Sequence, residues 1–227
     1  MFDPRDIPVL GIDSHLVGVG KDRLKPQALR DRFRHPPTWT PEHSVEAKFS
    51  DRLPALAAVL LPLVMRAELM LLLTERSHNL STHSGQIAFP GGRTDDTDQD
   101  AVQTALREAY EEIGLPRHHI EVLGTLPTYV SGSAFIITPV VALVSPGFQL
   151  VPNPAEVADV FEVPLSFLMN PAHHRRHETE FDGVQRQWLS MPYYDPVGQA
   201  VGGQTLERYI WGATAGMLRN FYRFLIA

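Results

Sequence analysis

The chain has 227 residues, of which 44% are hydrophobic and 20% charged, so we expect a packed core rather than disorder. Its formal net charge is -6, whereas nucleic-acid binding needs clustered positive charge, so we expect no nucleic-acid partner. The sequence contains no cysteine, which excludes disulfides, thiolate nucleophiles and Cys-ligated zinc. The N-terminus lacks the plan of a signal peptide, and the longest apolar run, residues 53–65, contains two prolines and is too short to span a bilayer. We therefore expect a cytoplasmic protein without membrane attachment.

The first half of the chain divides into an extension and the start of a main domain. Residues 1–50 are rich in proline and charge, and we expect them to pack as an N-terminal extension on a domain of residues 51–227. Within the extension, Lys21–Phe33 has the pattern of a short helix. Two apolar runs over 56–74 flank a polar turn and predict a β-hairpin, and Gln86–Phe89 is a short strand leading into Pro90-Gly91-Gly92.

The second half begins with the clearest helix of the sequence. Apolar residues at helical spacing predict it: Val102, Ala105, Leu106, Ala109 and Ile113. Gly114 follows as a left-handed cap. Strands are predicted over 120–126, 134–144 and 157–163, with a hairpin of 174–181 and 184–190 around Asp182-Gly183. A closing helix over 210–225 has an apolar face that joins either the core or a homodimer contact. Strands predominate, so the class is α+β with a mixed sheet.

Three glutamates share one face of the central helix. Glu108, Glu111 and Glu112 follow the spacing i, i+3 and i+4. Bunched carboxylates repel one another unless a cation neutralises them, and hard oxygen ligands suit Mg²⁺ or Mn²⁺, which also hold substrate phosphates. Arg107 can pair with these glutamates, and Gly92 permits a tight turn where a backbone carbonyl approaches the metal. Taken alone, such a trio is more often a solvated helix face, so the context decides.

The helix carries a recognisable pattern. Arg107-Glu108-Ala109-Tyr110-Glu111-Glu112-Ile113-Gly114-Leu115 resembles the Nudix box, in which a glycine and a spaced acid precede Arg-Glu-apolar-x-Glu-Glu-x-Gly-apolar. The loop here is one residue longer than usual, so Gly92 and Asp98 take the roles of that glycine and acid. The resemblance implies the Nudix fold, an α/β/α sandwich with a mixed sheet, and metal-dependent hydrolysis of a pyrophosphate bond. It implies Glu108, Glu111, Glu112 and Gly92 as metal ligands. Catalytic roles fall to Glu108, to Glu111, which would orient or deprotonate water, and to Arg107.

A second motif lies just before the box: Leu72-Leu73-Thr74-Glu75-Arg76-Ser77, then Leu80, His83 and Gly85-Gln86-Ile87-Ala88-Phe89-Pro90-Gly91-Gly92. It is similar to the extra motif of Nudix enzymes that hydrolyse coenzyme A to 3′,5′-ADP and 4′-phosphopantetheine. The similarity implies that Arg76, His83 and Gln86 bind the substrate, a small nucleotide. One position departs from the motif, because Ser81 stands where an arginine is usual, and serine cannot replace a bidentate phosphate ligand.

Two alternatives to coenzyme A hydrolysis follow, one from the departure at Ser81 and one from the possibility that the glutamates have no catalytic role. The first is a Nudix pyrophosphatase for ADP-ribose, NADH or dinucleoside polyphosphates. The second belongs to another class, a catalytically idle Nudix module that only binds a nucleotide. The intact glutamates argue against idleness, because a pure binder has no need of mutually repelling carboxylates.

Two further features keep open interpretations. Glu156 lies where many Nudix enzymes place a fourth acid, so it is either a general base in place of Glu111 or a surface acid. On a strand, His173, Arg175 and His177 would share one face, with His174 and Arg176 on the other. This basic cluster either contacts a substrate phosphate or, as is more usual, forms a solvated strand face.

Overall fold

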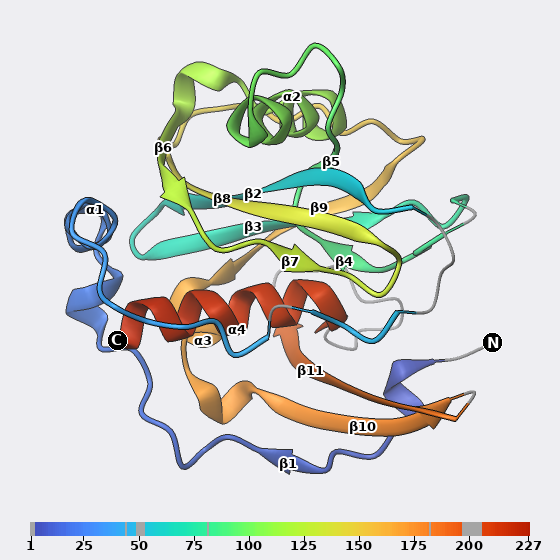
Figure 1. Cartoon of the computed structure of the whole chain (residues 1–227). Helices are drawn as coiled ribbons and strands as arrows, with labels where there is room; N and C mark the ends of the chain where they lie inside the picture. The colour runs from blue at the N-terminus through green and yellow to red at the C-terminus, as the bar shows by residue number, and fades with distance from the viewer. Residues whose placement is uncertain (1–2, 44, 49–52, 81, 182, 197–205) are drawn as a thin grey trace.

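The computed structural model describes residues 3–43, 45–48, 53–80, 82–181, 183–196 and 206–227, and its elements are arranged in layers (Figure 1). Helix α2 covers one face of a large sheet, helix α4 lies along the other face, and a second sheet lies beyond α4. The helices are α1 (Pro26–Arg34), α2 (Ala101–Ile113), α3 (Leu165–Leu168) and α4 (Gly212–Ile226). Short 3-10 turns occur at Pro4–Asp6, Lys21–Leu24, Arg117–His119 and Pro171–His173. No helix in these ranges is long and apolar enough to cross a membrane.

The large sheet is mixed. Its strands are β2 (Ala55–Met65), β3 (Leu69–Arg76), β4 (Ile87–Ala88), β5 (Gly91–Arg93), β6 (Ile120–Thr125), β7 (Tyr129–Val130), β8 (Phe135–Val144) and β9 (Val157–Pro164). Strands β2 and β8 pair in parallel, whereas the other pairs are antiparallel. Both central strands are apolar over most of their length because helices cover both of their faces. The predicted α+β class with a mixed sheet is confirmed.

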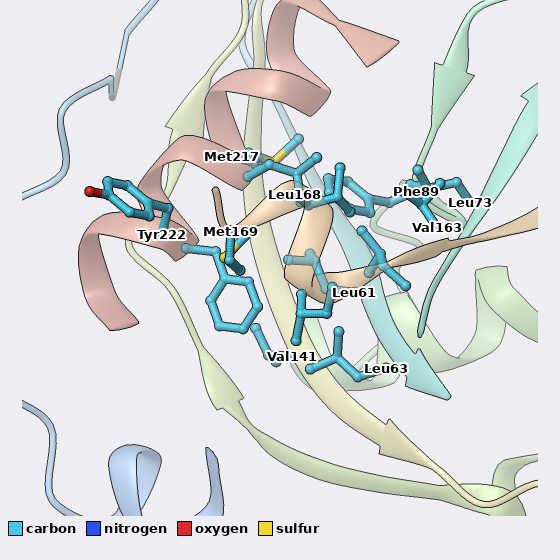
Figure 2. Close-up of a cluster of buried hydrophobic side chains, with 14 of the residues drawn as sticks. Leu61, Leu63, Leu73, Phe89, Val141, Val163, Leu168, Met169, Met217 and Tyr222 are labelled. Carbon is cyan, nitrogen blue, oxygen red and sulfur yellow. The ribbon is translucent and has the colours of Figure 1, made fainter. Parts of the chain in front are cut away.

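Alternation along β2 divides the interior into two cores. Leu60 and Val64 face α2 and pack in a cluster with its residue Ile113. Leu61 and Leu63 point to the opposite face, where they join a larger cluster with residues of α4 (Figure 2). The labelled members of this larger cluster are Leu61, Leu63, Leu73, Phe89, Val141, Val163, Leu168, Met169, Met217 and Tyr222. The sheet is therefore held from both sides.

The second sheet was not predicted as a separate layer. Its order is β1 (Gly11–Ile12), β10 (Arg175–Phe181), β11 (Val184–Asp195) and β12 (Leu206–Trp211), all antiparallel. The predicted helix start at Ile210 is wrong, because Ile210 and Trp211 end β12. Trp211 is extended, and Gly212 follows with φ of 60°, so the helix begins only there. The apolar face of α4 lies in the core of its own chain and so gives no support to a homodimer.

Other predicted elements are confirmed with local changes. Helix α2 ends at Ile113 with Gly114 as its left-handed cap, and the hairpins of β2–β3 and β10–β11 are present. The predicted helix over Lys21–Phe33 divides into a 3-10 turn and α1. Pro26 starts α1 because it lacks the N–H that would continue an earlier helix.

The N-terminal segment contacts the second sheet and α4 through buried charge. Strand β1 pairs with the edge of β10, and Asp13 and Glu42 both form ion pairs with Arg219 of α4 and Arg176 of β10. The Arg219 side chain is only 1% exposed. Burial alone would raise the pKa of Glu42, but the neighbouring His43 and the hydrogen bonds from Arg219 and Arg176 hold it well below its usual range. A domain boundary at residue 50 stays a prediction, because residues 49–52 lie outside the described ranges.

This network predicts a large effect for a conservative substitution in the extension. Glu42→Gln leaves the buried guanidinium of Arg219 short of one negative partner, and we expect it to lower the free energy of unfolding by about 2–3 kcal/mol. Urea denaturation measures the change. Asp22→Asn, which breaks the exposed pair with Lys25, is the control and should leave the midpoint nearly unchanged. Equal midpoints for the two variants would contradict a structural role for the Glu42 network.

Candidate active site

The ends of α2 fix the positions of its glutamates. At the start, the Asp100 side chain accepts a hydrogen bond from the Gln103 N–H at 2.8 Å and caps the helix. At the end, Gly114 has φ of 67°, and the N–H groups of Gly114 and Leu115 donate to carbonyls of the last turn. A Cβ at Gly114 would also lie 3.0 Å from the Val151 nitrogen. Both helix ends are thus set by side chains and backbone that the sequence already indicates.

Gly91 and Gly92, which were predicted to form a tight turn, instead begin strand β5, and they lie directly against the glutamates of α2. Strand β5 pairs with β2, which is packed under the helix. A Cβ on Gly92 would lie 2.5 Å from Oε2 of Glu108, so any side chain at this position would displace the Glu108 carboxylate. The Gly91 N–H donates to Oε2 of Glu112 at 3.1 Å. The structure therefore brings together Gly92, Glu108 and Glu112, three of the residues named as metal ligands.

The environment of these carboxylates disfavours their charged forms. Glu112 is only 5% exposed, and burial raises its pKa to about 7, against the opposing effects of the Gly91 N–H and the Arg76 guanidinium. Burial also raises the pKa of Glu108, and the charge of Glu156 adds to this effect at both residues. The carboxylates of Glu108, Glu112 and Glu156 thus repel one another in a partly buried place. Arg76 lies close enough to Glu112 for its charge to lower the pKa of that carboxyl.

Arg107 holds the outer side of this group. Its Nη1 donates to Glu108 at 2.8 Å and to Glu111 at 2.9 Å, while Nε and Nη2 donate to Asp98 at 3.0 and 2.8 Å. The hydrogen bonds from Arg107 keep the pKa of Asp98 well below its usual range. Asp98 therefore occupies the place of the spaced acid despite the longer loop. Glu111, at 54% side-chain exposure, lies at the solvent side of the group.

The donor set suits a metal that is only partly enclosed by protein. Within the described ranges, no three His, Asp or Glu side chains gather closely enough to hold an ion by themselves. Mg²⁺ commonly takes one or two protein carboxylates and completes its shell with waters and phosphate oxygens. Glu108 and Glu112, with carbonyl oxygens of the adjacent glycines, have the chemistry of that mode.

The loop between β3 and β4 brings the three predicted substrate-binding residues together. The Arg76 N–H donates to the Gln86 carbonyl at 3.0 Å, and the Gly85 N–H donates to the Arg76 carbonyl at 3.1 Å. The side chains of His83 and Gln86 share a hydrogen bond of 2.9 Å. Among the described residues, none accepts a hydrogen bond from the buried Nε of Arg76. Ser81, which departs from the motif, lies outside the described residues.

Glu156 belongs to the carboxylate group rather than to a distant surface. Its charge raises the pKa of both Glu108 and Glu112, and its backbone carbonyl accepts a hydrogen bond from Ser77 N–H at 2.8 Å. Asn153, which the sequence did not indicate, donates from its side chain to Glu156 at 2.9 Å and from its backbone to the Glu112 carbonyl at 2.8 Å. Its position three residues before Glu156, followed by proline, is a turn signal that could have pointed to it.

The solvated strand face predicted for the histidine cluster is wrong. His174 is fully buried, bonding the Leu168 carbonyl through Nε2 and Arg219 through Nδ1. His177 is buried against Trp188 and bonds Ser190 Oγ. His173 lies in a 3-10 turn before β10 begins, stacked on Phe167. Helix α4 covers His174 through Arg219, whereas the N-terminal segment covers His177 through the Ile7 carbonyl on the other face of β10. Both ring nitrogens of each histidine have partners within the chain.

The raised pKa of Glu112 predicts a pH-dependent stability in the absence of metal. Because the folded-state pKa of about 7 lies above the usual 4.5, unfolding releases a proton between these pH values and stability falls as pH rises through them. Glu112→Gln removes this penalty, so at pH 8 with EDTA the variant should be more stable than wild type by on the order of 3 kcal/mol. At pH 4.5 the difference should nearly vanish.

Chemical denaturation at the two pH values measures this, with Glu111→Gln as the control on the exposed side of the helix. If the difference in unfolding free energy between wild type and Glu112→Gln does not change with pH, the pKa of Glu112 is not raised in the folded protein.

Comparison with known proteins agrees with this geometry. The family model for the NUDIX domain matches residues 54–191. Proteins described as "Uncharacterized Nudix hydrolase NudL" are similar to the chain. The protein from Photorhabdus laumondii is 40% identical over 164 residues, which are 72% of this chain and 81% of that protein. The protein from Escherichia coli K12 is 40% identical over 165 residues, 72% and 79% of the two chains.

Solved structures are similar at lower coverage. A Nudix hydrolase from M. smegmatis, RenU, has a TM-score of 0.41 at 25% identity and covers 56% of this chain and 78% of its own. An Ap4A hydrolase from C. elegans has a TM-score of 0.43 at 19% identity, with 52% and 85% covered. The family match spans more than half of the chain and includes β5 and all of α2. On that match, and on the 40% identity over 72% of its length to the Nudix hydrolases above, this chain belongs to the Nudix hydrolase family.

Proposed function

We propose that this Nudix pyrophosphohydrolase acts on coenzyme A or its derivatives, releasing 3′,5′-ADP and 4′-phosphopantetheine. One observation carries the proposal: the carboxylates of the partly buried Glu108 and the buried Glu112 lie against Gly91 and Gly92 of β5, while Arg76 extends its charge to the same place. Negative ligands for a cation and a positive ligand for a phosphate therefore meet at one end of α2. The motif from Leu72 to Gly92 supports coenzyme A as the substrate.

Mg²⁺ or Mn²⁺ would be held by Glu108 and Glu112, with Glu111 and the Gly92 carbonyl as further oxygen donors. When bound, the cation polarises the phosphate and neutralises the charge that develops on it. Arg107 fixes the Glu108 side chain through the ion pair at 2.8 Å and is itself anchored on Asp98. The water is oriented or deprotonated by Glu111 or by Glu156, both of which lie beside Glu108.

Substrate contacts fall to the loop between β3 and β4. The buried Nε of Arg76 donates to none of the residues that the structure describes, and a guanidinium recognises phosphate oxygens well because its donors form a planar fork. A phosphate bound there would satisfy this donor and lie next to Glu112. His83 and Gln86, already joined by a hydrogen bond, offer further polar groups at the same loop.

The alternatives differ in what they need from this site. An idle nucleotide-binding module gains nothing from carboxylates that burial and mutual repulsion disfavour. A pyrophosphatase for ADP-ribose, NADH or dinucleoside polyphosphates uses the same carboxylates, and the serine at position 81 is the observation that favours it. These two enzymes are separated by substrate rather than by mechanism.

A substrate screen with Mg²⁺ and Mn²⁺ tests the proposal. Coenzyme A, dephospho-coenzyme A, ADP-ribose, NADH and diadenosine polyphosphates are incubated with the chain, and products are separated by chromatography. We expect coenzyme A to yield 3′,5′-ADP and Glu112→Gln to lower kcat by roughly 10²–10⁴-fold. Faster turnover of ADP-ribose than of coenzyme A would favour the second enzyme. A Glu112→Gln variant as active as wild type would reject the catalytic site itself.

Restoring the arginine of the motif gives a separate test of substrate choice. We expect Ser81→Arg to lower KM for coenzyme A by about tenfold at low salt, because one charge-assisted contact contributes about 1.5–3 kcal/mol. The gain should shrink at high salt if the contact is open to solvent. Steady-state kinetics on coenzyme A at two ionic strengths measure both effects. An unchanged KM at low salt would mean that position 81 takes no part in substrate binding.

A further inference from the structure

Arg208 of β12 is a buried cation held by acids from three different strands. Its side chain is 4% exposed. Its Nη1 donates to Glu75 at 2.8 Å, Nη2 donates to Asp159, and Nε donates to Asp195 at 3.4 Å. The guanidinium also lies 4.2 Å from the centre of the Phe161 ring. Arg208 of the second sheet therefore joins that sheet to β3 and β9 of the large sheet through ion pairs.

Two of the acids would repel each other without this arginine. Glu75 and Asp159 are direct partners in the antiparallel pairing of β3 with β9. Like charges at directly opposed positions destabilise a strand pair, because their side chains lie only a few ångströms apart. Arg208 bonds to both carboxylates and neutralises the repulsion at this one register position.

The pairing changes at the very next position. Glu75 opposes Asp159, but Arg76 opposes Val157, so Ala158 is an extra residue that forms a β-bulge. Alternation places Glu75 on the face toward Arg208 and Arg76 on the opposite face, where its charge acts on Glu112. Glu156 precedes the bulge on the other strand and accepts the Ser77 N–H at 2.8 Å. Both Arg76 and Glu156 thus leave the sheet at the bulge.

We propose that Arg208 is a positioning residue of the active site, which acts by neutralising Glu75 and Asp159 and so keeps the bulge in the register that directs Arg76 and Glu156 toward Glu112. Its activity readout rests on the proposed function. Arg208 touches neither the carboxylate group of α2 nor the loop of residues 77–86 in the hydrogen bonds described above. Among the described residues its side chain bonds to Glu75 of β3 and Asp159 of β9, which lead to both.

The test compares Arg208→Met with the triple variant Arg208→Met/Glu75→Gln/Asp159→Asn, in the full-length chain. The single variant leaves the two facing acids unneutralised, and we expect kcat to fall at least about tenfold, since small displacements of positioned groups are costly. Mn²⁺ affinity, measured by electron paramagnetic resonance without substrate, should weaken in parallel. The triple variant removes both the cation and the repulsion, so kcat and Mn²⁺ affinity should return to within about threefold of wild type.

Arg66→Met is the matched control, because Arg66 also joins the β2–β3 hairpin to β9, through Glu162, but at the opposite end of the strands. It should leave kcat and Mn²⁺ affinity unchanged. Equal behaviour of Arg208→Met and Arg66→Met would overturn the proposal. So would a folded triple variant that stays as impaired as the single one. If Arg208→Met does not fold, the triple variant is compared with wild type alone. A folded triple variant with kcat or Mn²⁺ affinity outside about threefold of wild type would then overturn the proposal.

The two proposals fail in different ways. If the wild-type chain hydrolyses none of the pyrophosphates in the screen, the proposed function fails. The Mn²⁺ affinities of the same variants still test Arg208, because they require no turnover. If wild type is active and Arg208→Met has the same kcat and Mn²⁺ affinity as the Arg66→Met control, the proposed function stands and the positioning role is rejected.

Discussion

The structure depends on holding like charges close together on one helix. Glu108 and Glu112 face the two glycines of β5, which leave little room beside them, and Glu156 adds a third negative charge. Such a group is costly to fold without a cation, so the rest of the molecule must supply rigidity that prevents the carboxylates from turning toward water. The capped helix, β5 and the Arg107–Asp98 pair all serve this end.

Charge compensation by arginine recurs across the layers of the molecule. Arg107 lies between the acids of α2 and its preceding loop, Arg208 joins three strands, and Arg219 joins α4 to the N-terminal segment. Each is surrounded by at least two carboxylates, and the last two are nearly inaccessible to solvent. Planar guanidinium groups suit this role because several donors can act in different directions at once. The layers are therefore joined by ion networks as well as by apolar contacts.

The sequence predicted the parts of the fold whose signals are local. Helix α2, its cap at Gly114 and the two hairpins have periodicity and turn residues within a short window, and the box and its neighbouring motif indicated Glu108, Glu112 and Arg76 as candidate site residues. What it could not show depends on distant pairing. Strand β12 pairs with β11, and its last apolar residues were predicted to start the closing helix. The change from strand to helix occurs at Gly212. His174 and His177 were predicted to be solvated because nothing local indicates that α4 covers one and the N-terminal segment the other.

The contacts of Asp13 and Glu42 with Arg219 also bear on how the protein folds during synthesis. The partners are separated by most of the chain, and α4 supplies much of the core beneath the large sheet. During synthesis α4 leaves the ribosome after β2, β3 and the N-terminal segment, so until then the apolar face of β2 and β3 and the acids of that segment lack their partner. Contacts between distant parts of a chain slow folding. Nascent chains should therefore remain protease-sensitive until α4 emerges.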